Sequence, residues 1–109
     1  MIPSPQAIET KVQQVVNDLK AYHPQQVILF GSTARGDADQ YSDLDFVILK
    51  HTTQPFLERL KEVALLCTVP GAIDFLVYTP QEWRQMQEME APFAQRVLTE
   101  GRTVYEAQP

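Results

Sequence analysis

Apolar positions near the start of the chain recur at the spacing of an α-helix. Residues 5–21 predict an amphipathic helix, with Ser4 as the N-cap residue and Pro5 at the first helical position. His23-Pro24 ends this helix, because the residue before a proline is disfavoured in the helical region. The apolar face of the helix contains Ile8, Val12, Val15, Val16 and Leu19.

Three short apolar runs bounded by turn-forming residues predict strands over residues 27–30, 44–50 and 72–78. In the second run, alternation places Asp45 on one face of the strand and its apolar neighbours on the other. A mostly polar segment links the first two strands, and a parallel pair needs a crossover of about a dozen residues. The sequence leaves the direction of this pair open.

Two later segments have helical spacing, residues 55–67 and residues 80–100, and the second is broken near Ala91-Pro92. Gly101 suits the C-terminal cap of this second segment. The order of helices and strands predicts an α/β layered structure, in one domain that spans residues 1–109.

Smaller signals complete the predicted order of elements. Thr79, Pro80 and Glu82 have the spacing of a capping box that opens a helix. A short helix is expected directly after Gly31, and residues 103–105 predict a final strand.

The net charge, the lengths of the apolar runs and the cysteine count limit the classes of protein to which the chain can belong. The net charge of −5 makes binding to long nucleic acids unexpected, because that binding depends on many Lys and Arg contacts to phosphates. We expect a cytoplasmic protein, since no apolar run has the ~18–20 residues of a membrane span and no signal peptide is evident. The single cysteine excludes a disulfide within one chain.

Three aspartates lie at strand positions among apolar residues. Asp43 and Asp45 are two residues apart, so on a strand both point to one face. Asp74 lies inside the third apolar run, and a carboxylate among apolar residues costs free energy of desolvation unless it belongs to a functional site. Because adjacent carboxylates repel unless a cation or proton lies between them, we expect the three to converge around Mg²⁺.

Gly31-Ser32 follows the first strand and is the second element of the expected site. A glycine there allows close approach to the backbone, and the N–H groups of a following helix would point at a phosphate. Arg35 either contacts a phosphate or the hydroxyl-bearing segment of a partner, or forms a surface salt bridge. No P-loop or dinucleotide-binding consensus is present.

The identity and spacing of these residues resemble the sequence motif of a known family. Gly31-Ser32, ten intervening residues and Asp43-Leu44-Asp45 match the Gly-Ser-x10-Asp-x-Asp signature of the DNA polymerase β-like nucleotidyltransferase superfamily. The segment GSTARGDADQYSDLDFVIL is similar to the sequences of the minimal nucleotidyltransferases in particular. The segment APFAQRVLTEGRTVYE resembles the last helix and strand of that family. Asp74 in AIDFLVY matches the position of the family's third carboxylate.

This resemblance implies a polymerase β-like palm of the α/β (α+β) class, with a small mixed sheet of three to four strands flanked by helices. It implies that Asp43, Asp45 and Asp74 are catalytic and hold one or two Mg²⁺ ions, with ATP as substrate. Asp74 would also help to activate the attacking hydroxyl. Gly31 and Ser32 would bind the β- and γ-phosphates.

The same resemblance implies a function as the antitoxin of a type VII HEPN/MNT pair. Such an enzyme transfers AMP from ATP to a tyrosine hydroxyl of its partner, the HEPN ribonuclease toxin. A chain of 109 residues has no room for a large second domain, which favours a protein as the acceptor. Two alternatives stay open: a non-catalytic antitoxin that neutralises the toxin by binding, and a small-molecule adenylyltransferase. A homo-oligomer or hetero-oligomer is compatible with all three.

An apolar stripe with helical spacing runs through the last helices. It packs into the core or forms a docking face for a partner, and the sequence does not decide between these interpretations. The stripe consists of Trp83, Met86, Met89 and Phe93.

Overall fold

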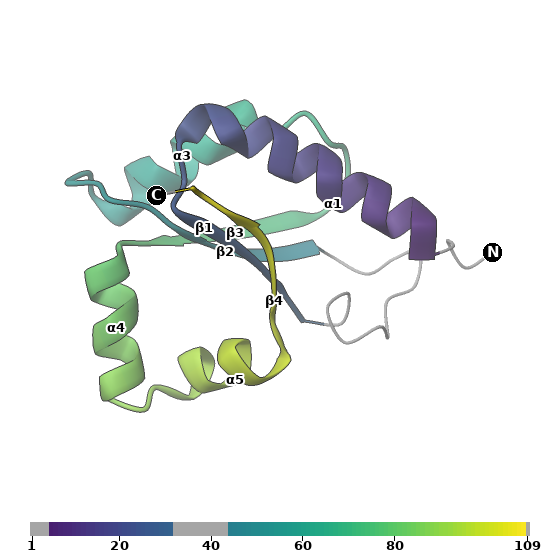
Figure 1. Ribbon diagram of the computed structural model, residues 1–109. Helices are drawn as coiled ribbons and strands as arrows, with labels where there is room; N and C mark the ends of the chain where they lie inside the picture. Colours follow the sequence, from purple (N-terminus) through teal and green to yellow (C-terminus); the bar gives the residue numbers. More distant parts are fainter. Residues whose placement is uncertain (1–4, 32–43, 109) are drawn as a thin grey trace.

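The computed structural model describes residues 5–31 and 44–108, and this part of the chain forms a four-stranded sheet with helices on both faces (Figure 1). The elements in chain order are α1 (Pro5–Leu19), η1 (Lys20–Tyr22), β1 (Gln26–Phe30), β2 (Leu44–Leu49), α3 (Phe56–Leu66), β3 (Ile73–Tyr78), α4 (Pro80–Glu88), α5 (Pro92–Glu100) and β4 (Arg102–Glu106). Helices α1 and α3 lie on one face of the sheet, and α4 and α5 lie on the other. The expected α/β class and the mixed sheet flanked by helices are confirmed.

The sheet has the strand order β3-β2-β1-β4. Strand β1 pairs antiparallel with both β2 and β4, whereas β2 pairs parallel with β3. The structure therefore settles the direction of the first two strands, which the sequence left open. The parallel pair is joined through α3, as a parallel connection requires.

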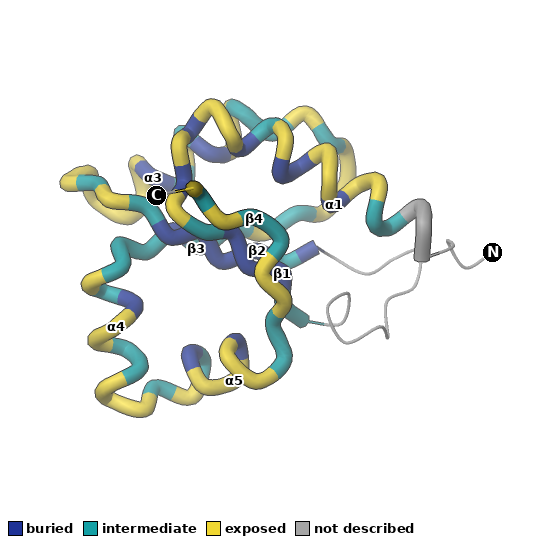
Figure 2. Tube along the Cα trace, viewed as in Figure 1, coloured by how far each residue is buried: buried dark blue, intermediate teal, exposed yellow. Residues whose placement is uncertain are grey.

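Two apolar cores lie on opposite faces of the sheet, because alternate residues of each strand point in opposite directions. Figure 2 shows buried residues along the strands and in the helices on both sides of them. The core under α1 and α3 includes the buried side chains of Leu29, Leu44 and Phe46. The core under α4 and α5 includes Val47 and Trp83. The even-numbered residues of β3 share the face covered by α4 and α5, as the position of Tyr78 shows.

The helix ends follow the predicted chemistry in most places. The Thr79 hydroxyl accepts a hydrogen bond from the backbone N–H of Glu82 at 3.0 Å, and the Glu82 carboxylate accepts one from the N–H of Thr79 at 2.8 Å. This reciprocal capping box opens α4 as expected. At His23 the chain leaves η1 through the left-handed region, with φ of 57°. The break between α4 and α5 lies before Pro92, as the sequence predicts.

Gly101 caps α5, but the left-handed geometry typical of a C-terminal glycine is absent there. Its φ of −76° and ψ of 159° are extended, and any residue could adopt them. The glycine is needed for space instead, since a Cβ atom would lie 2.4 Å from the carbonyl oxygen of Val97 and 2.9 Å from Cγ2 of Ile28. Close packing of α5 against β1 therefore explains this glycine.

Two expectations, the Ser4 N-cap and a short helix after Gly31, lie outside the described residues. Over residues 5–31 and 44–108, no helix is both long and apolar enough to cross a membrane.

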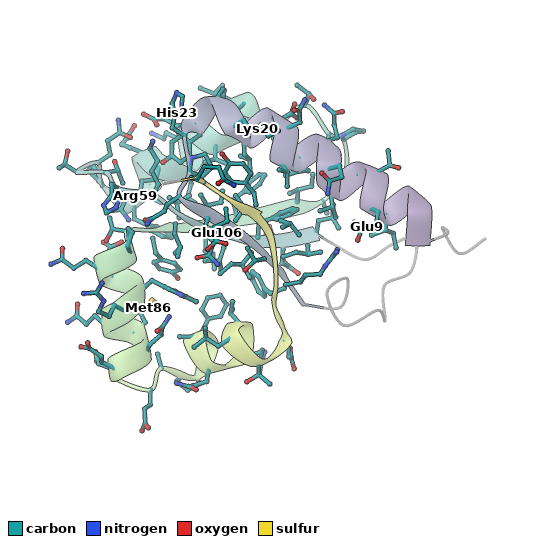
Figure 3. The ribbon with its side chains drawn as sticks, in the orientation of Figure 1. Glu9, Lys20, His23, Arg59, Met86 and Glu106 are labelled. Carbon is teal, nitrogen blue, oxygen red and sulfur yellow. The ribbon has the colours of Figure 1, made fainter. Side chains whose placement is uncertain are left out.

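Arg59 is a charged residue of α3 that the fold buries, with 6% of its surface exposed (Figure 3). Its Nε donates to the carbonyl oxygen of Gln54 at 2.8 Å, and its Nη1 donates to the carbonyl oxygen of Val77 at 3.1 Å. The guanidinium also pairs with both carboxylate oxygens of Glu82, at 2.7 and 3.3 Å. Arg59 thus links α3 to the C-terminal end of β3 and to the start of α4.

Candidate active site

Three side chains form a row across one end of the sheet. Phe30 of β1 is the register partner of Asp45 in β2, and Asp45 is the register partner of Asp74 in β3. Register partners point to the same face, with Cβ atoms typically about 4.5–5.5 Å apart. The structure therefore brings Asp45 and Asp74 together at the sheet end where β1 finishes and β2 and β3 begin.

The row lies on the face that carries α4 and α5. The residues two positions along, Ile28 in β1 and Val47 in β2, are buried under these helices. Asp45 is half-buried and Asp74 is exposed, so the carboxylates lie at the boundary between the apolar core and solvent. This position allows a charged ligand to reach the two carboxylates without burying either one completely.

Gly31 follows β1 directly and lies beside the Asp45 carboxylate. Its φ is +83°, in the region that favours glycine, and a Cβ atom there would lie 2.8 Å from Oδ2 of Asp45. The backbone conformation at Gly31 therefore disfavours any side chain, and a Cβ atom there would also displace the Asp45 carboxylate. The sequence predicted that another group approaches this glycine closely, and one such group is Asp45 of the same chain.

The remaining predicted site residues, Ser32, Arg35 and Asp43, lie outside the described residues. Among the described ones, Gly31, Asp45 and Asp74 meet at one end of the sheet. This part of the site is an acidic pair beside a backbone turn, and its chemistry suits a divalent cation with bound phosphate.

Aromatic residues border this row, and the sequence reasoning did not assign them to the site. The rings of Phe30 and Phe93 meet edge to face, with centroids 5.4 Å apart, and Phe93 meets Trp83 at 6.5 Å. Trp83 in turn stacks on Tyr78 at 5.7 Å. The aromatic cluster holds α4 and α5 on the sheet beside the acidic pair.

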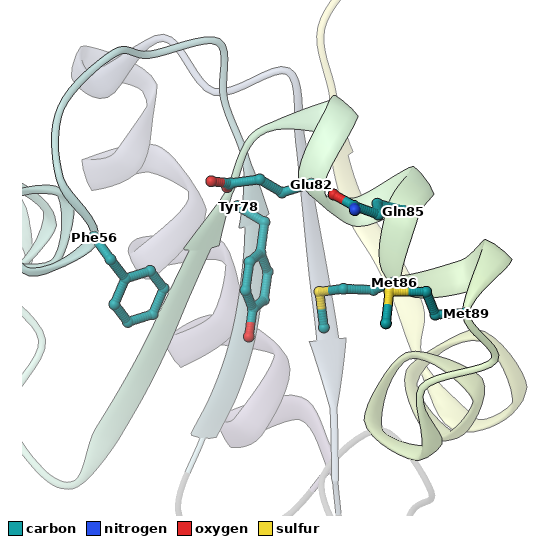
Figure 4. Close-up of a pocket in the computed structure, with 6 residues that line it drawn as sticks. All are labelled: Phe56, Tyr78, Glu82, Gln85, Met86 and Met89. Atoms are coloured by element: carbon teal, nitrogen blue, oxygen red, sulfur yellow. The ribbon is translucent and has the colours of Figure 1, made fainter.

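The structure places three of the four residues of the apolar stripe, Trp83, Met86 and Phe93, in the core under α4 and α5. Trp83 is buried and Phe93 packs in the core, whereas Met89 is 72% exposed. Met89 borders an open pocket of about 380 Å³ at the far end of β3 (Figure 4). Burial raises the pKa of Tyr78 in this pocket, and the nearby Glu82 carboxylate raises it further. This pocket also includes Phe56, Gln85 and Met86.

Comparison with known proteins agrees with this fold. Residues 11–109 match the family described as Polymerase beta, Nucleotidyltransferase. The chain is 32% identical over 83 residues to a Haemophilus influenzae protein named as a probable protein adenylyltransferase, MntA. The match covers 72% of this chain and 68% of that protein.

Solved structures show the same fold. A protein from Sulfolobus solfataricus assigned as a nucleotidyltransferase matches with a TM-score of 0.61 and 18% identity, over 91% of this chain and 86% of its own. A toxin–antitoxin structure with AMP-PNP matches with a TM-score of 0.58 and 21% identity, over 88% and 73% of the two chains. A mutant MntA–HpeT toxin–antitoxin structure matches with a TM-score of 0.56. The chain belongs to the polymerase beta nucleotidyltransferase family.

Proposed function

We propose that this nucleotidyltransferase is the Mg²⁺-dependent antitoxin of a HEPN/MNT pair, and that it transfers AMP from ATP to a tyrosine hydroxyl of the HEPN toxin. The observation that carries the proposal is the register pair of Asp45 and Asp74, with Gly31 against the Asp45 carboxylate. The similarity to a protein named as an adenylyltransferase supports AMP as the transferred group. Related folds solved as toxin–antitoxin structures support a toxin as the partner.

The described carboxylates fit Mg²⁺. Asp45 and Asp74 offer oxygen ligands on one face, next to solvent, and two neighbouring carboxylates favour a cation between them. Asp43 would be the third ligand, by its match to the family signature. When bound, the ion neutralises phosphate charge and stabilises the entering and leaving oxygens of the displacement.

The residues of the chain then have separate roles. Gly31 keeps the turn after β1 free of a side chain, so that phosphate oxygens can approach its backbone, while Ser32 and Arg35 would contact the same phosphates. Asp74 would accept a hydrogen bond from the acceptor hydroxyl and take its proton. The hydroxyl oxygen forms a new bond to the α-phosphorus as the bond to the bridging oxygen breaks, and pyrophosphate leaves.

The test uses ATP labelled at the α-phosphate, a purified HEPN toxin as the proposed acceptor, and three aspartate variants. We expect Asp45→Asn and Asp74→Asn to lower label transfer by about a hundredfold or more, because each removes charge that stabilises the transition state. Asp18→Asn is the matched control: it removes an aspartate of α1 that binds Thr68 rather than the site, and should keep transfer.

Each alternative function predicts a different result. Neutralisation of the toxin by the unmodified chain without any label transfer would indicate a non-catalytic antitoxin. Label transfer to a small alcohol without the toxin would indicate a small-molecule adenylyltransferase. Full transfer by Asp74→Asn would remove Asp74 from the proposed site.

A further inference from the structure

Among the residues that the structure describes, strand β3 pairs with β2 alone and forms an edge of the sheet. The N–H of Leu44 donates to the carbonyl oxygen of Ala72 at 3.1 Å, and the N–H of Lys50 donates to that of Tyr78 at 3.0 Å. Backbone groups of successive strand residues point to alternate sides, so the even-numbered positions face β2. The backbone N–H and C=O groups of Ile73, Phe75 and Val77 therefore point outward.

This outward edge is closed at one end and open at the other. The carbonyl oxygen of Val77 accepts the hydrogen bond from buried Arg59, which covers the end near Tyr78. Within the part of the chain that the structure describes, no hydrogen bond reaches the outward groups of Ile73 and Phe75. The open end of the edge is thus the end that carries Asp74.

The other edge strand differs in its protection. Strand β4 has charged residues at both ends, Arg102 and Glu106, and Arg102 forms an ion pair with Glu9 of α1. Charged residues and prolines are the usual protection of sheet edges against added strands. Strand β3 has the sequence IDFLVY, in which Asp74 is the one charged residue and no lysine or proline occurs.

We propose that the open edge of β3 binds an extended segment of the protein acceptor as a fifth strand, which places the acceptor hydroxyl beside Asp74. This inference rests on the proposed function. Residues paired across neighbouring strands share a face, with Cβ atoms about 4.5–5.5 Å apart, and diagonal neighbours are about 7–8 Å apart. A hydroxyl-bearing side chain opposite Asp74, or two positions along, therefore reaches its carboxylate.

The chemistry of the edge favours an acceptor segment over a second copy of this chain. Main-chain hydrogen bonds to Ile73 and Phe75 would supply affinity for any extended segment. The exposed Asp74 carboxylate selects a neighbour that donates a hydrogen bond or carries positive charge. A second β3 strand would bring its own aspartate and apolar side chains, and its only hydroxyl, that of Tyr78, lies at the end closed by Arg59.

The test removes one outward donor without changing any side chain. Cys67 is the single cysteine, so residues 1–66 can be ligated to a synthetic 67–109 segment with an N-methyl group on Phe75. This amide points away from β2, so no bond of the sheet is lost and the melting temperature should be unchanged. Val77 with the same N-methyl group is the matched control at the closed end.

AMP transfer to the HEPN toxin and ATP affinity are measured for each ligated protein. We expect the Phe75 modification to raise the KM for the toxin by about fivefold or more, through loss of one hydrogen bond and steric block, with ATP affinity unchanged. The Val77 modification should leave both unchanged. Equal effects of the two modifications, or none from either, would overturn the proposal.

Amide hydrogen exchange gives a second test on the unmodified chain. Binding of the toxin should slow exchange at Ile73 and Phe75 by at least about tenfold, whereas unchanged exchange at both amides would refute the added strand. If exchange at these two amides slows as the concentration of this chain rises, without the toxin, a second copy of the chain binds the edge of β3. That result would contradict our proposal. Absence of AMP transfer by the unmodified chain would instead refute the proposed function.

Discussion

Replacement of Gly31 by alanine tests the close contact on which the candidate site depends. At φ of +83°, a side chain costs about 1–2 kcal/mol in backbone strain. The new Cβ atom would also lie 2.8 Å from Oδ2 of Asp45, whereas ordinary contact begins at 3.4 Å, so the carboxylate must move by about 0.6 Å. Since a misplacement of ~1 Å can reduce catalysis about a hundredfold, we expect a tenfold to hundredfold loss of the proposed AMP transfer.

Gly71→Ala is the matched control for this prediction. Gly71 also has a positive φ, +110°, but the nearest atom to its Cβ position is the flexible Nζ of Lys11 at 3.6 Å. Both alanine variants should lose stability through strain, measured by urea unfolding, but Gly71→Ala should keep AMP transfer within about twofold. If both variants lose stability and Gly31→Ala still transfers AMP at the normal rate, the contact with Asp45 has no catalytic importance.

Three further predictions concern the stability of the fold. Arg59→Met should lower the free energy of unfolding by about 2 kcal/mol. This loss is smaller than the loss on breaking a fully buried ion pair, because the Glu82 side chain is 44% exposed. Urea unfolding with an unchanged m-value would measure it. Hydrogen bonding from Arg59 holds the pKa of Glu82 below its usual value. The ionised Glu82 carboxylate therefore stabilises the fold fully above the unfolded-state pKa of about 4.3, and this stabilisation is lost as pH falls through the folded-state pKa. Glu82→Gln should flatten the dependence of stability on pH in that acidic range, and an unchanged slope would contradict the assignment. Gly101→Ala should cost about 1–3 kcal/mol by overpacking against α5 and β1, and an unchanged melting temperature would show that the backbone relaxes freely.

The sequence predicted the strands well because their apolar runs end at glycines, prolines and polar residues. The structure places β1, β2 and β3 within one or two residues of the expected ranges. Alternation along the strands also correctly placed Asp45 opposite its apolar neighbours. The meeting of Asp45 and Asp74 was expected from the cost of carboxylates among apolar residues, and their register confirms the geometry but leaves their roles as a proposal.

Other features depend on contacts between distant residues, which a local pattern does not contain. No local pattern predicts the burial of Arg59, because its partners Val77 and Glu82 lie in other elements. Gly101 was interpreted by the common rule for helix ends, whereas its packing against β1 decides its identity. The antiparallel direction of β1 and β2 is a pairing between strands, and the local pattern within each strand does not determine it.

The parallel pairing of β2 and β3 has a consequence for the order of folding. Strands β1 and β2 are neighbours in sequence and pair antiparallel, so they can associate early, because few residues separate them along the chain. Asp74 reaches Asp45 only after the longer connection through α3 has closed, which costs more chain entropy. A growing or partly folded chain would therefore hold Gly31 and Asp45 in place before it could assemble the acidic pair. The chain would then become able to catalyse its reaction in a single late folding step, when β3 pairs with β2.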